Sequence, residues 1–178
     1  MSKRTRVITG VTIARLLAAG YILIAPLPGL LISMVFDFFD GRIFAATGTF
    51  TREVYHRWDK VLDMAGYCAE MIVVFRYGVW LPFLLLFVWR AAGYAIFVSD
   101  GPSWTFLAFP NIFEAAVLWL FLGLSVGWLW VFIVLKLVQE WALHWFVPHG
   151  GNIWWDRIVR RVLPKKSKLL RWSLSLRV

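Results

Sequence analysis

The chain has 178 residues, of which 61% are hydrophobic and only 16% are charged, and its formal net charge is +9. A globular domain usually has about 25% charged residues, so this composition argues against a water-soluble protein and favours a membrane protein. The single cysteine, Cys68, excludes an intramolecular disulfide and a cluster of thiolate metal ligands.

Six apolar runs follow one another along the chain. A helix that crosses the hydrocarbon core needs about 20 residues, at about 1.5 Å per residue. Residues suited to tight turns separate the first run from the second (Pro26, Pro28 and Gly29), the third from the fourth (Gly78 and Pro82) and the fifth from the sixth (Gly123 and Gly127). The expected spans are 7–25, 28–46, 59–77, 79–98, 104–123 and 125–147. We therefore predict an all-α, polytopic integral membrane protein with six transmembrane helices.

Basic residues predict the orientation of these spans. The N-terminal arm carries three basic residues, and segment 151–178 carries eight against one acid, Asp156. Both ends should therefore be cytosolic, which requires an even number of spans. The same topology places Arg52 and Arg57 in a cytosolic loop. We expect a multi-pass protein of the plasma membrane, or of the inner membrane if the source is bacterial.

The C-terminal segment 151–178 mixes apolar and basic side chains, and Pro164 divides it into two pieces. Basic amphipathic stretches lie in the membrane interface and attract anionic lipid. We expect a tail that binds anionic headgroups, following a single transmembrane domain of residues 1–150. Most of the positive charge lies next to the membrane, so nucleic acid is not an expected partner.

Four aspartates stand at the cytosolic ends of the second and third spans: Asp37, Asp40, Asp59 and Asp63. Carboxylates near a bilayer are costly, so four together indicate a bound cation. The spacings of three and four residues place each pair on one face of its helix. Two such helices side by side would form an all-oxygen cage, which suits two Mg²⁺ or Mn²⁺ ions.

The residues around these aspartates add a resemblance to a known family. The sequence Asp37-Phe38-Phe39-Asp40-Gly41, followed by Asp59 and Asp63, resembles the signature DxxDGxxAR…GxxxDxxxD of the CDP-alcohol phosphatidyltransferases. Thr12-Ile13-Ala14-Arg15 is similar to the TxxR of that family's first membrane helix. The chain departs from the signature at Phe44-Ala45, where the family has Ala-Arg, and at Tyr55, where it has the second glycine.

The resemblance implies a reaction and a set of roles. A phosphatidyl-type group would move from a CDP-linked lipid to a polar alcohol, with release of CMP, in a homodimer. All four aspartates would bind metal, and Asp63 would also remove the proton of the alcohol. The residues that would contact the donor nucleotide are Thr12, Gly41, Arg42 and Thr51, with Arg42 in place of the missing motif arginine.

Polar residues in the later spans suggest where the alcohol binds. Glu70, Arg90, Glu114 and Lys136 should all lie about 12–16 Å from the cytosolic boundary, and Asn111 on the same approach. We expect an acceptor pocket for a glycerol phosphate, inositol phosphate or serine type of alcohol. Alternatively, Arg90 only neutralises Glu70 or Glu114, because an unpaired buried ion is poorly tolerated.

Other functions remain open at this point. The altered motif is compatible with a non-catalytic member of the family that acts as a binding or scaffold subunit. Carboxylates within a membrane also line cation pathways, so a divalent-cation transport protein is a further alternative. The aspartates could also be helix caps alone, but Asp37 and Asp40 lie near the C-terminal end of their helix, where a carboxylate opposes the dipole.

Overall fold

The computed structural model describes residues 2–47, 52–99 and 105–142, and in these ranges every element is a helix. The helices are α1 (Lys3–Ile22), α2 (Pro26–Thr47), α3 (Arg52–Arg76), α4 (Trp80–Val98), α5 (Thr105–Ala108), α6 (Ile112–Leu122) and α7 (Val126–Trp141). The prediction of an all-α protein is confirmed for this part of the chain. The predicted tail, 151–178, lies outside it.

Helices α1 and α2 form a close hairpin. Pro26 begins α2, where its missing N–H leaves no hydrogen bond unmade. Gly29 lies against the end of α1, since a Cβ at this position would be 2.5 Å from the backbone nitrogen of Ile22. Arg76, at the end of α3, donates a hydrogen bond of 2.8 Å to the carbonyl of Leu23. The three helices are therefore joined at this end by a close backbone contact and a side-chain cap.

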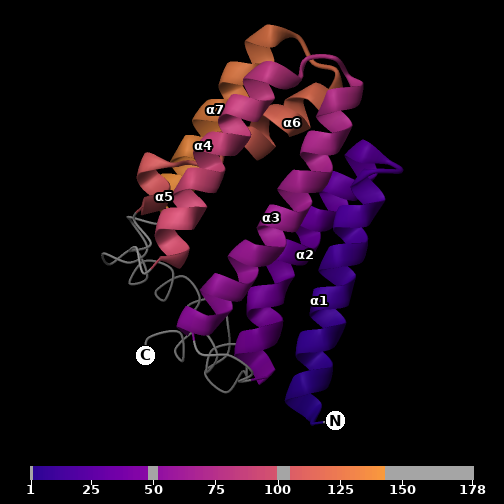
Figure 1. The fold of residues 1–178 in the computed structure, drawn as a ribbon, viewed down its shortest axis with the longest axis vertical. Helices are drawn as coiled ribbons and strands as arrows, with labels where there is room; N and C mark the ends of the chain where they lie inside the picture. The colour runs from indigo at the N-terminus through magenta and orange to yellow at the C-terminus, as the bar shows by residue number, and fades with distance from the viewer. Residues whose placement is uncertain (1, 48–51, 100–104, 143–178) are drawn as a thin grey trace, which may run out of the picture.

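The apolar core lies where α2, α3, α4 and α6 meet. Its buried members are Leu30, Tyr67, Met71, Val74, Phe83, Phe113, Ala116 and Val117. Helices α1, α2 and α3 lie side by side in one half of the molecule, and α4, α6 and α7 in the other (Figure 1). Helix α3 contacts both halves, and it carries half of the acidic motif.

The fifth apolar run is interrupted, which differs from the continuous span predicted for 104–123. Helix α5 ends at Ala108 and α6 begins at Ile112. Between them Pro110 lacks a backbone donor. Asn111 then caps α6, because its side chain accepts a hydrogen bond from the backbone N–H of Glu114. The break brings the polar Asn111 into the interior, where it is buried.

In the described part of the chain, two helices are long and apolar enough to cross a membrane, Arg4–Ile22 and Trp80–Val98. Only 22% and 17% of their most apolar windows are buried inside the protein. Large apolar side chains are also exposed on other helices, among them Trp128, Trp130 and Leu135 of α7. An extensive exposed apolar surface marks a site for lipid or another protein, which points to a membrane protein.

The arrangement of six spans is not confirmed. Helix α6 has 11 residues and the described part of α7 has 16, which is shorter than the hydrocarbon core requires. Helices α2 and α3 have sufficient length, but they contain the charged residues of the acidic motif. The six-span topology and the cytosolic position of both termini therefore stay predictions.

Candidate functional site

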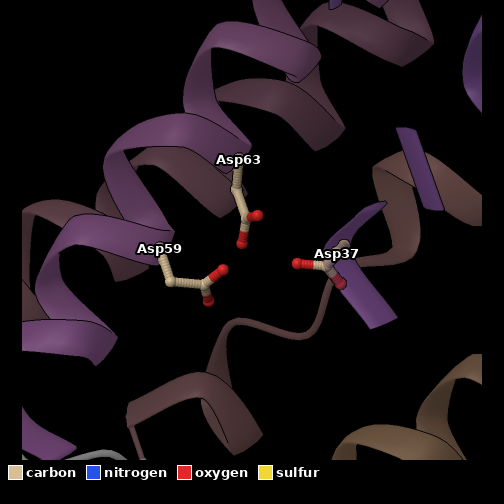
Figure 2. A group of neighbouring side chains, drawn as sticks. All are labelled: Asp37, Asp59 and Asp63. Carbon is tan, nitrogen blue, oxygen red and sulfur yellow. The ribbon is translucent and has the colours of Figure 1, made fainter. Parts of the chain in front are cut away.

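The four motif aspartates lie together between α2 and α3. Asp37 and Asp40 are in the second half of α2, and Asp59 and Asp63 are in the first half of α3, so each pair shares a helical face. Figure 2 shows Asp37 on one helix directed toward Asp59 and Asp63 on the other. One carboxylate oxygen of each of these three residues lies within 4.8 Å of the others. We call the four residues the acidic cluster.

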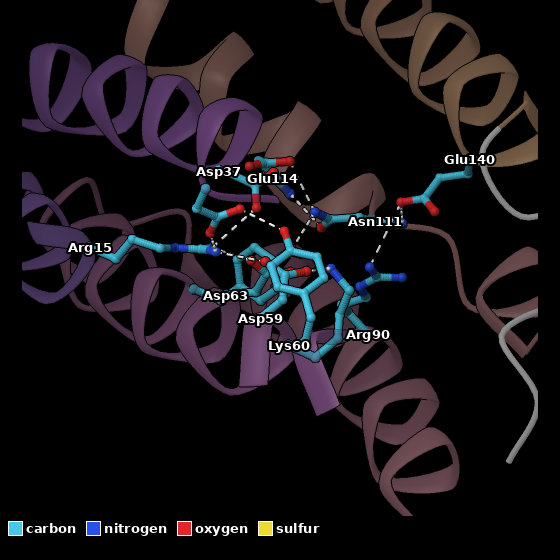
Figure 3. Close-up of polar contacts among 12 residues, drawn as sticks. Arg15, Asp37, Asp59, Lys60, Asp63, Arg90, Asn111, Glu114 and Glu140 are labelled. Carbon is cyan, nitrogen blue, oxygen red and sulfur yellow. Dashed lines mark hydrogen bonds and ion pairs between the residues drawn. The ribbon is translucent and has the colours of Figure 1, made fainter. Parts of the chain in front are cut away.

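Arg15 of α1 lies at the centre of the acidic cluster (Figure 3). Its Nη1 donates to Asp59 Oδ1 at 2.6 Å and also to Asp40 Oδ2. Its Nη2 donates to Asp63 Oδ1 at 2.6 Å and to Asp37 Oδ1 at 3.2 Å. The guanidinium is planar and has several fixed donors, so it can bond to all four carboxylates at once.

Lys60 adds a second cation. Its Nζ is 2.9 Å from Asp59 Oδ2, and it donates to the second oxygen of Asp63. Four carboxylates together with Arg15 and Lys60 have a formal charge of −2, if all six groups are ionised. The acidic cluster thus keeps an excess of negative charge after both bases have paired with it.

Among the described residues, the acidic cluster is exposed mainly at Asp37. The Asp37 side chain is 53% exposed, whereas those of Asp40, Asp59 and Asp63 are almost fully buried. A ligand that approaches from outside the helix bundle would therefore meet Asp37 first.

Tyr55 packs over the glycine of the motif. Its hydroxyl donates to Asp40 Oδ1 at 2.6 Å, and a Cβ added to Gly41 would lie 2.9 Å from the same hydroxyl oxygen. Burial raises the pKa of the Tyr55 phenol above its ordinary value, and the carboxylates of Asp59 and Asp40 raise it further, so the phenol keeps its proton. Tyr55, which replaces the second glycine of the family signature, therefore covers the face of Gly41 that was expected to contact a nucleotide.

Three other residues were predicted to contact the donor nucleotide: Thr12, Arg42 and Thr51. Thr12 lies on α1, half-buried, and its hydroxyl donates to the carbonyl of Ile8 at 2.8 Å. The backbone of Arg42 is in α2, but its side chain lies outside the described part of the structure, as does Thr51. Because the structure describes the contacts of only Thr12 and Gly41 among the four predicted donor residues, the nucleotide-binding set stays a prediction.

A polar cavity of about 80 Å³ adjoins the acidic cluster. Asp37, Asp63, Arg15 and Lys60 form part of its wall. All five residues predicted for the acceptor pocket also line it, namely Glu70, Arg90, Asn111, Glu114 and Lys136. The structure thus brings the predicted acceptor residues to one cavity beside the motif aspartates.

Most charged groups of this cavity already have partners. Arg90 donates to the carbonyl of Phe109 at 2.7 Å and is 3.8 Å from a carboxylate oxygen of Glu140. It therefore pairs with Glu140, and the alternative of a pair with Glu70 or Glu114 is wrong. Glu114 instead pairs with Lys136, at 2.7 Å. Arg90 is held in this position because the break before α6 brings the Phe109 carbonyl within its reach.

Asn111 connects α3 with α6. Its side-chain nitrogen donates to the hydroxyl of Tyr67 at 2.6 Å and to a carboxylate oxygen of Glu114 at 3.0 Å. Its backbone N–H donates to Glu140 at 3.2 Å. Asn111 is thus held rigidly in the cavity wall by residues of three helices.

The sequence analysis gave no role in the site to five residues that the structure places there: Arg15, Tyr55, Lys60, Tyr67 and Glu140. Arg15 is a charge within an otherwise apolar run, and an intramembrane charge by itself indicates a functional site. Lys60 is the neighbour of Asp59 and one helical turn from Asp63. Tyr55 was noted only as a departure from the motif, whereas it is a direct partner of Asp40.

Comparison with family models, with curated proteins and with solved structures finds no match for this chain. The likeness to the CDP-alcohol phosphatidyltransferases therefore consists of the motif residues described above.

Proposed function

We propose that the protein is a membrane-embedded transferase that moves a phosphatidyl-type group from a CDP-linked lipid to a polar alcohol and releases CMP. One observation carries this proposal. Four aspartates from two helices converge on a single point, directly beside a polar cavity. Such an arrangement suits a reaction in which a charged diphosphate and an alcohol must meet.

The residues of the acidic cluster fit the two divalent cations that this function requires. All donors are carboxylate oxygens, which hard cations prefer, and three carboxylates lie within 4.8 Å of one another. The excess negative charge that remains beside Arg15 and Lys60 also favours added cations. Bound Mg²⁺ or Mn²⁺ would neutralise the diphosphate and stabilise the departing CMP.

Asp63 is suited to act as the base. It belongs to the acidic cluster and lines the cavity as well, so its carboxylate faces the place where the alcohol would bind. The alcohol oxygen would lose its proton to Asp63 and form a bond to the β-phosphorus of the donor. The bond between that phosphorus and the CMP oxygen would break, and CMP would leave with the electron pair.

Production of CMP by purified protein tests this function. We expect release of CMP from labelled CDP-diacylglycerol when Mn²⁺ and a polar alcohol are both present, and loss of release after addition of EDTA. Asp59→Asn should also abolish it, because an amide keeps the shape of the side chain but loses its charge. No CMP with any acceptor and either metal would refute the transferase.

A non-catalytic binding subunit is the second candidate, and one specific observation favours it. Arg15 and Lys60 already supply two positive charges to the acidic cluster, and Tyr55 bonds to Asp40 where the family has glycine. A chain adapted to hold its carboxylates without metal would show such contacts. Saturable binding of CDP-diacylglycerol without release of CMP would identify this function.

A further inference from the structure

Glu70 is a buried carboxylate of the cavity for which no ion pair is found among the described residues, whereas Glu140 pairs with Arg90 and Glu114 with Lys136. The side chain of Glu70 is only 2% exposed, it lines the cavity, and its Oε2 has no hydrogen-bond partner among the described residues. A buried polar atom without a partner is costly, and such atoms are rare in folded proteins. Glu70 therefore needs a partner group that the described residues do not provide.

The basic residues of the cavity are already engaged elsewhere. Arg90 contacts Glu140 and the Phe109 carbonyl, and Lys136 contacts Glu114. Arg15 and Lys60 contact the acidic cluster, which has more carboxylates than these two cations can neutralise. The cavity thus offers a carboxylate to a ligand and has its positive charges paired. An anionic ligand would have to displace one of these ion pairs.

We propose that the cavity binds a small alcohol that carries an ammonium group, with Glu70 as the counter-ion of that group. An ammonium donates hydrogen bonds to the buried carboxylate and also neutralises it, whereas an uncharged hydroxyl can only bond to it. This inference rests on the proposed function for the statement that the alcohol is the acceptor of the transferred group.

The position of Glu70 agrees with that role. Glu70 and Asp63 are both on α3 and seven residues apart, so they share a face and are separated by about 10 Å along the axis. Both side chains line the same cavity. An amino alcohol held by its nitrogen at Glu70 can extend its hydroxyl toward the proposed base.

The size of the cavity sets a limit on the ligand. One water needs about 10–15 Å³ of such a cavity, so about 80 Å³ has room for several non-hydrogen atoms. Small amino alcohols such as 2-aminoethanol or serine meet this limit. We choose 2-aminoethanol as the probe because it has one ammonium, one hydroxyl and no other charge.

Calorimetric titration of the full chain in detergent, with EDTA present, tests the proposal without turnover. We expect saturable binding of 2-aminoethanol, and at least tenfold weaker binding of ethylene glycol, which lacks the charge, and of glycerol 3-phosphate, which is anionic. Glu70→Gln should weaken the binding of 2-aminoethanol at least tenfold. Cys68→Ala changes an exposed residue of the same helix that does not line the cavity, and it should leave the binding of 2-aminoethanol unchanged.

The outcomes separate this inference from the proposed function. Equal affinity of the wild type for 2-aminoethanol and ethylene glycol, or tighter binding of glycerol 3-phosphate, would overturn the inference even if Glu70→Gln did not fold. Unchanged affinity in a folded Glu70→Gln variant would do the same. Release of CMP with an anionic acceptor alone would refute the ammonium site and leave the transferase intact. Binding that depends on Glu70, without release of CMP, would support the site and refute the transferase.

Discussion

Arg15→Gln removes the cation that joins α1 to the acidic cluster. The guanidinium is 5% exposed and bonds to carboxylates of both α2 and α3. Glutamine keeps a polar side chain of moderate length but lacks the charge. The variant would leave four neighbouring carboxylates with Lys60 as their remaining cation among the described residues, so they would repel one another.

The expected loss of stability follows from this change. Removal of one partner from a buried ion pair costs about 3–5 kcal/mol, because the other partner stays buried and unpaired. For a chain of this size, each kcal/mol lowers the melting temperature by about 2–4 °C. The melting temperature without metal should therefore fall by about 6–20 °C.

Added Mn²⁺ should restore part of this loss. A ligand at about 100 times its dissociation constant stabilises the folded state by about 2.7 kcal/mol. The gain should be larger in Arg15→Gln than in the wild type, where the cation must compete with the guanidinium for the same oxygens. This difference between the two proteins is the part of the result that tests the position of the metal.

Thermal melting in detergent, with EDTA and with Mn²⁺, measures both effects. Arg6→Gln is the matched control, because Arg6 is an exposed arginine of the same helix and its replacement should shift melting little. An Arg15→Gln protein that melts like the wild type in EDTA would refute the structural role of Arg15. Equal gains from Mn²⁺ in both proteins would show that metal binds elsewhere.

Three further predictions concern other parts of the molecule. Tyr55→Phe loses a hydrogen bond to the Asp40 carboxylate, which is worth about 1.5–3 kcal/mol. The melting temperature should therefore fall by at least about 3 °C. An unchanged melting temperature would contradict a stabilising role of this hydrogen bond. Asp63→Asn should lower kcat by about 10²–10⁴ in CMP release while CDP-lipid affinity stays the same, and equal losses would make it a ligand only. Gly29→Ala should lower the melting temperature, because its Cβ would collide with the α1 backbone. Gly20→Ala is the control, since a Cβ at Gly20 meets open space. Similar melting temperatures of the two variants would refute the close approach of α1 and α2.

Much of the helical framework could be predicted, because long apolar runs between Pro and Gly residues indicate helices on their own. The fourth run, predicted at 79–98, matches α4, Trp80–Val98. The third helix begins at Arg52, well before the predicted 59. Its first turns are polar and aromatic, so hydrophobicity alone does not reveal them, whereas their contacts with Asp40 and Phe44 stabilise the helix.

The candidate site could be predicted in part, for a similar reason. The spacing of the aspartates places them on helical faces, and this periodicity is local information. The position of Arg15 among them depends on how α1 packs against α2 and α3, and the pair of Arg90 with Glu140 depends on the break before α6. Such contacts between distant segments have no periodic signature. They become visible only when the helices are assembled.

The contacts of Arg15 also affect how the chain enters a membrane. Arg15 is synthesised 48 residues before Asp63, one of its partners. Insertion of an arginine at the centre of a lone helix is unfavourable by about 2.5–3.5 kcal/mol. Helix α1 is therefore poorly accommodated in lipid by itself. We expect α1 to remain at the insertion machinery until α3 has emerged, so that Arg15 enters the bilayer already paired with carboxylates of α2 and α3.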